Sequence, residues 1–483
     1  MLFNSYSFLF GYLPVVFVVF FLLCRWHLVQ AAKIWLLLSS LFFYGYWDVR
    51  FLPLLLGSIC FNYFCGLQIL NHAQNQRKGK AAVLLGVFAN LSLLFYFKYF
   101  NFFIVNLTGA SWDFAEILLP LGISFFTFTQ IAYLIDVYRK KADSCGVVSY
   151  GLFVTVFPHL IAGPILHHKQ MLRQFDNLRM YVFQWSNVSQ GIFLFVLGLS
   201  KKVIIADTLS TYVKPIFDTP LESVPFIQAW FGAITYTLQL YFDFSGYSDM
   251  AVGLGLLFNL YLPINFNSPY KADSIIDFWR RWHMTLSAFL KDYLYISLGG
   301  SREGKFNHLR NLMVTMFLGG LWHGAGWTFI AWGAMHGTFL VINHLWRDLK
   351  IALPHWIAKS LTLFAVIVGW VIFRSPDIST ALSILKGMFL LNGVGLPLKY
   401  ETSLNFLKNF GIFFADNLRI NVRITELALV FILFIGVLYV PNSFDWLEKF
   451  KQKPRKWAFS CALLFIFCLL CMDDMVEFLY YQF

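Results

Sequence analysis

The sequence predicts an all-α polytopic membrane protein, and its composition, its apolar runs and the placement of its charges each indicate this class. Of the 483 residues, 59% are hydrophobic and only 13% are charged, whereas soluble chains carry about 25% charged residues. The aromatic content of 20% is typical of transmembrane helices with Trp and Tyr at both membrane surfaces. The net charge of +12 comes from short basic clusters between apolar runs, which favours cytoplasmic loops over nucleic-acid binding.

The apolar runs follow one another along the whole chain, and several are longer or shorter than one span of about 20 residues. We therefore expect about 10–12 transmembrane helices, together with amphipathic and re-entrant helices that do not cross the bilayer. The runs lie at roughly 8–24, 34–46, 51–71, 81–107, 117–137, 148–166, 188–217, 226–242, 250–262, 312–346, 357–373, 425–440 and 458–472.

The charges between these runs predict the topology. Residues 8–24 are apolar, and no small-residue cleavage site follows them, so we expect an uncleaved first span with its N-terminus outside. Acidic or neutral loops at 111–116 and 218–225, and the acidic stretch 473–477, predict the outer side and an external C-terminus. Basic loops that predict the cytoplasmic side lie at 77–80, 139–141, 167–179, 302–310 and 449–456.

The chain shows no internal repeat and no low-complexity linker, so we expect one integral-membrane domain, 1–483. Its motif-bearing core covers about 115–350, and the helices of about 376–483 are less distinctive. The seven cysteines mostly lie in apolar runs and are interpreted as small buried hydrophobic residues. Cys468 and Cys471 form a C-x-x-C inside such a run with no second pair, which does not indicate a metal or redox site.

Three stretches interrupt the hydropathy pattern. Residues 157–164 place two prolines and a glycine in an apolar run, and non-helical backbone at membrane depth must be surrounded by protein or water. Residues 243–249 separate two apolar runs and carry Asp243 and Asp249. Because unpaired carboxylates are costly there, we expect each to meet a cation, a hydroxyl or water.

The third interruption is a predicted amphipathic helix from Ser274 to about Tyr295, close to the cytoplasmic side. Ser274 and Asp277 have the spacing of a capping box. An apolar stripe and a polar stripe then run along the same stretch with helical spacing. The apolar stripe consists of Phe278, Trp282, Leu286, Phe289 and Tyr293, and the polar stripe of Arg280, His283, Ser287 and Lys291.

His323 lies in a glycine-rich stretch, 319–327, about ten mostly apolar residues after a basic loop. At about 1.5 Å per helical residue it would lie roughly 15–20 Å from that loop, near the bilayer midplane. An imidazole at that depth indicates a functional site. The glycines let another backbone, a ligand or a bent helix approach closely. The alternative interpretation is a buried structural histidine whose nitrogens have hydrogen-bond partners within the protein.

The other histidines give weaker signals. In one continuous helix His323 and His336 would lie on different faces and about 20 Å apart, so His336 is interpreted as a supporting or packing residue unless Gly324–Gly326 breaks the helix. His283 lies on a separate helix and is the expected companion of His323. His72, His167, His168 and His308 lie in basic loops and are expected to be solvated, and no metal-binding pair of histidines occurs in the apolar runs.

A buried neutral imidazole can act as a general base toward a hydroxyl or hold a thioester carbonyl. The cytoplasmic basic loops could hold the phosphates of a coenzyme-A-type donor, although positive-inside lysines have the same appearance.

Several motifs together resemble the membrane-bound O-acyltransferase (MBOAT) family, in particular its bacterial alginate O-acetyltransferase branch. The resemblance covers about residues 5–375. The motifs are Leu119–Phe128, Ala162–Ile165, Asp243–Asp249, Trp279–His283, Leu321–Gly324 and Gly333–Gly337.

The resemblance implies a fold, a site and a reaction. The fold is a ring of tilted helices around a thin centre, with the catalytic histidine at His323 and a second important position at His283. No cofactor is implied, because acetyl-coenzyme A or another cytoplasmic acyl thioester is the donor substrate. An acceptor polysaccharide or a partner acetyltransferase outside the membrane receives the acyl group. The residues expected to line the substrate channel are Trp322, Trp327, Trp282, Arg280, Asp243 and Asp249.

We therefore expect a bacterial inner-membrane acyltransferase for the O-acetylation of an exported polysaccharide, with His323 as general base. A transporter of a lipid or sugar is the main alternative, since midplane polar residues and broken helices also fit a transporter. A processive polysaccharide synthase would need a soluble domain longer than any polar stretch here. A scaffold with a vestigial histidine is a further alternative. The acceptor stays open among alginate, cellulose, peptidoglycan and teichoic acid.

Overall fold

The computed structural model of the protein describes residues 1–72, 74–109, 117–218, 223–415, 418, 422–472 and 478–479. Within these residues the chain is almost wholly helical, and its only strands form a two-stranded parallel sheet. The predicted all-α class is therefore confirmed. The predicted outer loop 111–116, residues 219–222 of the loop 218–225 and the acidic stretch 473–477 lie outside the described residues.

The chain divides into two compact units, each built from separate stretches of sequence. Unit 1 comprises Met1–Ser200, Gly246–Asn265 and Ser443–Gln482, and unit 2 comprises Lys201–Ser245 and Phe266–Asn442. The helices of unit 1 are α1 (Leu13–Arg25), α2 (Val29–Gly45), α3 (Leu52–Asn71), α4 (Gln76–Leu94), α5 (Phe100–Thr108), α6 (Ile123–Tyr138), α7 (Val147–Thr155), α8 (His168–Phe175), α9 (Trp185–Ser200), α20 (Ser443–Gln452) and α21 (Pro454–Leu470).

Unit 2 contains the other helices and both strands, and α11 (Phe226–Leu257) continues from unit 2 into unit 1. The elements of unit 2 are α10 (Asp207–Phe217), α12 (Ile275–Arg281), α13 (Met284–Phe289), the π-helical η7 (Leu290–Tyr295), α14 (Lys305–His323), α15 (Trp327–Asp348), α16 (His355–Arg374), α17 (Ile378–Met388), β1 (Val394–Pro397), α18 (Glu401–Leu404), β2 (Ile412–Ala415) and α19 (Ile424–Tyr439).

Four of the described helical segments are long and apolar enough to cross a membrane. A fifth is counted if α19 and α20 together make one span. The count of 10–12 spans stays a prediction. The four segments are Ser7–Arg25, Val49–Asn71, Gln76–Thr108 and His355–Arg374.

Two predicted elements differ from the structure. The polar stretch 243–249 does not separate two helices, because it lies within the single 32-residue helix α11. The predicted helix 274–295 is broken at Trp282–His283, where His283 has a left-handed φ of 42°. Ser274 does cap α12, since its Oγ accepts a hydrogen bond from the Asp277 backbone N–H at 3.1 Å. The break turns His283 out of the polar stripe and leaves it fully buried.

The stretch 157–164 agrees with its interpretation. It follows the end of α7, lies outside any helix, and every one of its residues is buried. His159 Nε2 lies 3.2 Å from the Phe153 backbone oxygen, so this imidazole contacts a carbonyl near the C-terminal end of α7. Protein therefore surrounds the irregular backbone, as the low polarity of a membrane requires.

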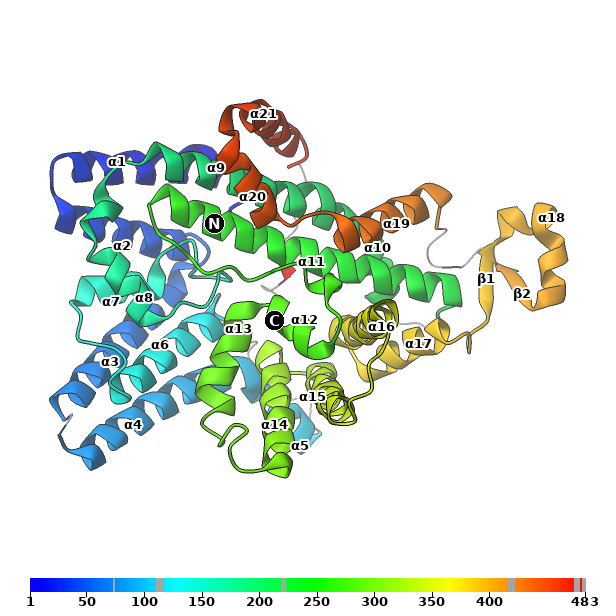
Figure 1. The fold of residues 1–483 in the computed structure, drawn as a ribbon, viewed down its shortest axis with the longest axis horizontal. Coiled ribbons are helices and arrows are strands. Elements are labelled where there is room, and N and C mark those ends of the chain that lie inside the picture. Colours follow the sequence, from blue (N-terminus) through cyan, green and yellow to red (C-terminus); the bar gives the residue numbers. More distant parts are fainter. Residues whose placement is uncertain are drawn as a thin grey trace. The chain divides into compact units, whose positions relative to one another are not determined.

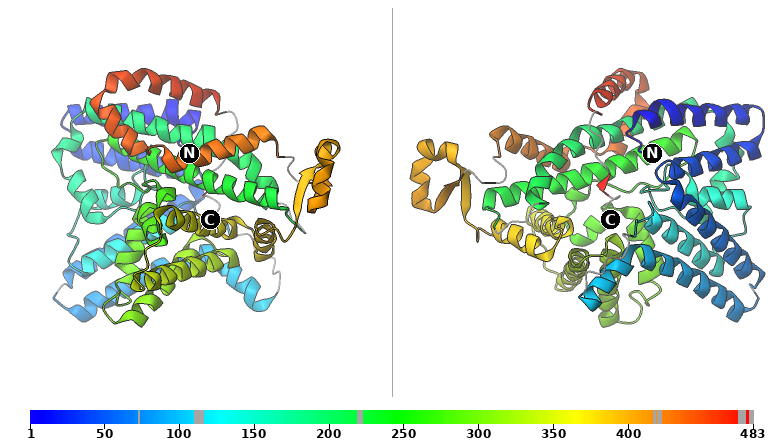
Figure 2. Two further views of the ribbon diagram at one scale, coloured as in Figure 1. Left: turned by 45° about the vertical axis from the view of Figure 1, so that its right-hand side comes forward. Right: turned by 180° about the vertical axis from the view of Figure 1, so that it is seen from behind.

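Helices α14 and α15 form a tightly packed hairpin, and they lie side by side in every view (Figures 1 and 2). Gly324–Gly326 separates them, which confirms the helix break that these glycines allowed. Lower along the hairpin, a Cβ on Gly320 would lie 2.8 Å from the Gly333 Cα and 2.4 Å from the Phe329 backbone oxygen. The two helices therefore approach so closely that only glycines fit between them.

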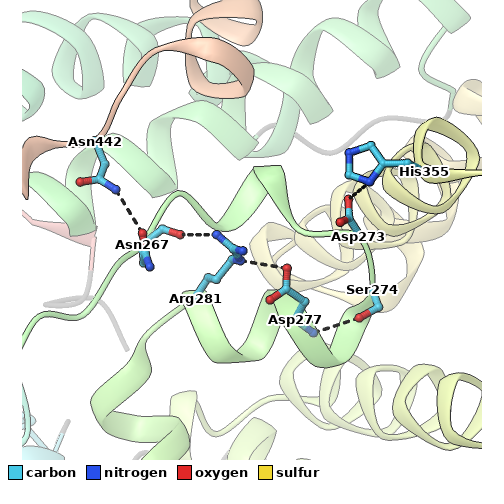
Figure 3. A network of polar contacts seen from close by, with 7 residues as sticks. All are labelled: Asn267, Asp273, Ser274, Asp277, Arg281, His355 and Asn442. Atoms are coloured by element: carbon cyan, nitrogen blue, oxygen red, sulfur yellow. Dashed lines mark hydrogen bonds and ion pairs between the residues drawn. The ribbon is translucent and has the colours of Figure 1, made fainter. Parts of the chain in front are cut away.

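A polar network fixes the segment that precedes His283 (Figure 3). The Arg281 side chain donates to Asp277 at 2.9 Å and to the Asn267 backbone oxygen at 3.4 Å. Asn442 donates to the Asn267 side chain at 3.1 Å. The Asn267 backbone N–H also donates to the Arg281 backbone oxygen at 3.0 Å, so α12 is tied at the residue next to the break.

A buried ion network lies elsewhere in unit 2. The Lys202 ammonium is 2.6 Å from Asp207 and 2.8 Å from Asp243, and the Lys202 side chain is only 4% exposed. One cation therefore compensates two carboxylates away from water.

We expect Gly320→Ala to lower the melting temperature of the purified protein, since overpacking a core costs about 1–3 kcal/mol. The matched control is Gly319→Ala, whose added Cβ meets only the flexible Leu290 side chain at 3.2 Å. Equal melting temperatures for the two variants would contradict the close packing of α14 on α15.

Lys202→Met should destabilise the protein strongly, because removing one partner of a buried ion pair costs about 3–5 kcal/mol. Thermal unfolding in detergent measures the effect. Adding Asp207→Asn and Asp243→Asn to Lys202→Met should restore part of the lost stability, because no uncompensated charge remains. A triple variant that is less stable than Lys202→Met would show that the network is not held by charge.

Candidate active site

His323 is the last residue of α14 and is 4% exposed. Its ring lies 5.0 Å from the Trp322 ring, 5.2 Å from the Trp332 ring and 5.2 Å from the Phe373 ring, measured between centroids. Three helices, α14, α15 and α16, supply these aromatic neighbours. The arrangement surrounds one buried imidazole with aromatic rings from three helices.

His283 is fully buried at the break between α12 and α13. Its ring lies 4.7 Å from the Phe244 ring and 6.4 Å from the Trp322 ring. Trp322 is therefore a neighbour of both His283 and His323. The sequence predicts that His283 can approach His323 directly as its companion, and that role stays a prediction; the contact that the structure gives is one from Trp322 to each of the two rings.

The Trp332 indole contacts both His336 and His323. His336 is fully buried, and its ring lies 4.8 Å from the Trp332 ring, which in turn contacts His323. Neither His336 nitrogen has a hydrogen-bond partner among the residues that the structure describes. A Cβ on Gly369 would lie 2.8 Å from His336 Nε2, so α16 passes close to this nitrogen. The helix break thus brings His336 nearer to the site than a continuous helix would allow.

The tryptophans expected in the channel separate into two kinds. Trp282 is 2% exposed and packs on the Trp370 ring at 4.8 Å and the Phe278 ring at 5.7 Å. Trp322 is 4% exposed beside His323. Trp327, at the start of α15, is 57% exposed. Trp282 and Trp322 therefore belong to the aromatic core of the site, and Trp327 lies at its surface.

The two carboxylates of the polar stretch fall in different units. Asp243, in unit 2, pairs with Lys202 at 2.8 Å. Asp249, in unit 1, accepts a hydrogen bond from the Ser443 hydroxyl at 2.6 Å. The expectation that each would meet a cation or a hydroxyl is confirmed. A role for them in the channel stays a prediction.

Arg280 lines a cavity of about 380 Å³ that opens beside α12, η7, α14 and α15. Sequence reasoning missed four further residues of this cavity, Lys291, His308, His344 and Arg347. His308 is not simply solvated, since its Nδ1 lies 2.5 Å from the Tyr295 hydroxyl. His168, in another basic loop, is wrongly predicted as solvated: it is 2% exposed in unit 1.

The pairing of His308 with His344 could have been found from the sequence. The two residues lie 18 positions before and 18 positions after Gly326, so a hairpin folded at Gly324–Gly326 places them opposite each other. Within the described part of the chain, no group of three metal-binding side chains is found.

Comparison with known proteins identifies the family. A sequence model described as MBOAT, membrane-bound O-acyltransferase family, matches residues 41–373. A peptidoglycan O-acetyltransferase of Helicobacter pylori is 41% identical across 100% of this chain and 98% of its own length. A probable alginate O-acetylase AlgI of Pseudomonas aeruginosa is 43% identical across 80% of this chain and 75% of its own. A teichoic acid D-alanyltransferase of Streptococcus thermophilus is 28% identical across 48% of this chain.

The match to the family model covers more than half of the chain and includes the whole histidine site. His283, His323 and His336 all lie inside it, as does the cavity lined by Arg280. The chain is thus an acyltransferase of a membrane, and it belongs to the membrane-bound O-acyltransferase family.

Proposed function

We propose that this protein moves an acetyl group from a cytoplasmic acyl thioester across the bacterial inner membrane to an exported polysaccharide. A partner acetyltransferase outside the membrane is the alternative first acceptor. The observation that carries the proposal is the burial of His323 among aromatic rings at the end of α14, inside the region matched by the family model. Relatives named as peptidoglycan and alginate acetylating enzymes support acetyl as the group transferred.

His323 acts as general base in this proposal. It takes the proton from the acceptor hydroxyl as the oxygen bonds to the thioester carbonyl carbon, and the carbon–sulfur bond then breaks. The departing thiolate takes up a proton, so the products are an acetate ester and a free thiol. The apolar enclosure keeps water away, which protects the thioester from hydrolysis.

His283 orients the donor or the acceptor, or stabilises the charge that develops on the carbonyl oxygen. The Trp322 indole beside both histidines supports such cooperation, because a small reacting group beside that indole could reach either ring. Trp282 shapes the same enclosure through its contact with Trp370.

Peptidoglycan is the acceptor that we favour. The Helicobacter pylori peptidoglycan O-acetyltransferase matches this chain along its full length, whereas the alginate relatives cover 80% of it. Alginate is the second candidate, because the Pseudomonas aeruginosa relative is 43% identical over the part it covers, against 41% for the peptidoglycan enzyme. Base-labile acetate on purified muropeptides and on secreted polysaccharide, compared between wild type and a deletion strain, distinguishes the two.

The transporter alternative predicts a different fate for the substrate. A transporter would move its substrate into liposomes unchanged, whereas an acyltransferase forms a new ester. Membership in an acyltransferase family supports the second outcome.

His323→Ala should lower polysaccharide O-acetylation by at least about 100-fold, since general-base catalysis contributes 10²–10⁴-fold. Base-released acetate measures the product, and immunoblots of the membrane fraction confirm that the variant is present. His72→Ala, in an exposed cytoplasmic segment, is the matched control and should retain full acetylation. Wild-type acetate in the His323 variant would refute its role as base.

His283→Gln should lower kcat by roughly 100-fold with His323 intact, as expected for the loss of one group that stabilises developing charge. The comparison is His336→Gln, which lies beside Trp332 and contacts no proposed reacting group. Steady-state kinetics in detergent or nanodiscs measures both. A smaller loss of kcat for His283→Gln than for His336→Gln would reverse the roles proposed for these two histidines.

A further inference from the structure

An apolar cavity of about 460 Å³ lies within unit 1, where α1, α9, α20 and α21 come together. None of the lining residues that the structure describes is charged, and the polar ones are Ser189 and Cys461. The Ser189 hydroxyl already donates to the Ser186 backbone oxygen at 3.0 Å. The occupant of this cavity must therefore be apolar, because a charged or polar group would lose its hydration there without a partner.

Helix α21 turns a face of mostly small side chains toward this cavity. The face consists of Ala458, Cys461, Ala462 and Phe465, which have the i, i+3, i+4, i+7 spacing of one side of a helix. Three of these four side chains are small, so they do not fill the space between α21 and α9. The cavity is thus a consequence of the sequence of α21.

Contacts near both ends of α21 hold it in this position beside α9 (Figure 1). Before α21 begins, Phe450 of α20 stacks on Phe193 of α9, with ring centroids 4.4 Å apart. Near its other end, the Leu469 backbone oxygen accepts a hydrogen bond from the Tyr6 hydroxyl at 2.8 Å. Since α21 is held at both ends, the space between them remains for an apolar molecule. In a membrane the acyl chains of lipids are the apolar solvent.

A basic turn, residues 449–456, joins α20 to α21. It contains five exposed cations, and no Asp or Glu occurs between positions 449 and 472. Lys451 pairs with Glu448 at 2.6 Å. In the described part of the chain the other four form no ion pair with a carboxylate. No side chain caps the start of α21, so the positive end of its helix dipole adds to this charge.

The basic turn and the apolar cavity are adjacent. Phe450 belongs to the turn and lines the cavity, and Ala458 lines it two residues after Lys456. From Ala458 to Phe465 the lining extends about 10 Å along α21, at 1.5 Å per residue. A ligand that fits both features has an anionic head and a hydrocarbon chain.

Two tryptophans beside the basic turn are typical of the level where such a head group lies. The Trp446 and Trp457 rings are 5.3 Å apart, and the Lys449 ammonium lies 4.3 Å from the Trp446 ring centroid. Trp is enriched where membrane meets water. The aromatic pair therefore supports a position of the basic turn at the membrane surface, with the cavity on its apolar side.

We propose that unit 1 binds one anionic phospholipid of the cytoplasmic leaflet, with its phosphate on the basic turn and one acyl chain in the cavity between α9 and α21. The charge pattern predicts a cytoplasmic position for residues 449–456, and basic clusters at that side of an apolar helix attract anionic lipids. The site lies in unit 1 alone and does not depend on the reaction proposed for His323.

The first test varies the head group. Binding of phosphatidylglycerol and of phosphatidylcholine with the same acyl chains to the purified full-length protein in detergent is measured by native mass spectrometry. Wild type should bind one phosphatidylglycerol at least about tenfold more tightly than phosphatidylcholine. Lys453→Gln/Arg455→Gln/Lys456→Gln should abolish this preference. The matched control is Arg77→Gln/Lys78→Gln/Lys80→Gln, which removes three exposed cations at the start of α4 and should keep the preference.

The second test fills the cavity. Ala462→Phe should weaken binding of both lipids at least about tenfold, because the added ring takes the place of the acyl chain. Ala458→Phe fills the same cavity nearer the basic turn and should act in the same way. Ser460→Phe adds the same ring to an exposed position of α21 outside the lining and should leave both affinities unchanged. The melting temperature of each variant shows whether it is folded.

Three results would overturn the proposal. The first is equal affinity of wild type for the two lipids. The second is an equal loss of phosphatidylglycerol binding in the basic-turn variant and in its control on α4, which would indicate a general effect of positive charge. The third is wild-type lipid binding by folded Ala462→Phe and Ala458→Phe variants. A dimer that binds no phosphatidylglycerol would likewise refute it, because a second copy of the chain would then cover this face.

Discussion

The close approach of α14 and α15 is the constraint on which the site depends. Gly324–Gly326 ends one helix and lets the next return beside it, and Gly320 and Gly333 let the two backbones come together. Because the hairpin folds about this break, residues at equal distances on either side become neighbours. The same fold places His323 at the top of the hairpin and the His308–His344 pair near its base.

The site is organised by a separation of apolar and charged groups. Around His323 the described ring neighbours are aromatic, and the side chain is buried away from water. The cationic groups lie away from the hairpin turn, where Lys291 of η7 and Arg347 of α15 line the cavity.

Much of the fold and part of the site could be predicted from the sequence, because the relevant signals are local. Apolar runs predict helices wherever lipid or protein surrounds them, and the glycines beside His323 allow a helix break without requiring one. The prediction that Ser274 caps the following helix was also correct. That Asp243 and Asp249 would each have a cation or a hydroxyl as partner was predictable, since an isolated buried carboxylate is costly. The partners themselves, Lys202 and Ser443, are distant in sequence and could not be named.

The sequence by itself determined the helical class, the membrane environment and the family motifs around His323. Only the tertiary structure decided that α11 continues through its two carboxylates, because Lys202 from another segment compensates Asp243. Likewise, only packing decided that the helix of residues 274–295 breaks at His283, which has a left-handed backbone conformation. The end of α12 just before this break is fixed by the hydrogen bond from Arg281 to the Asn267 backbone oxygen. A helical pattern records which side chains are apolar, but a break or a buried ion pair depends on groups that the chain brings together from far apart.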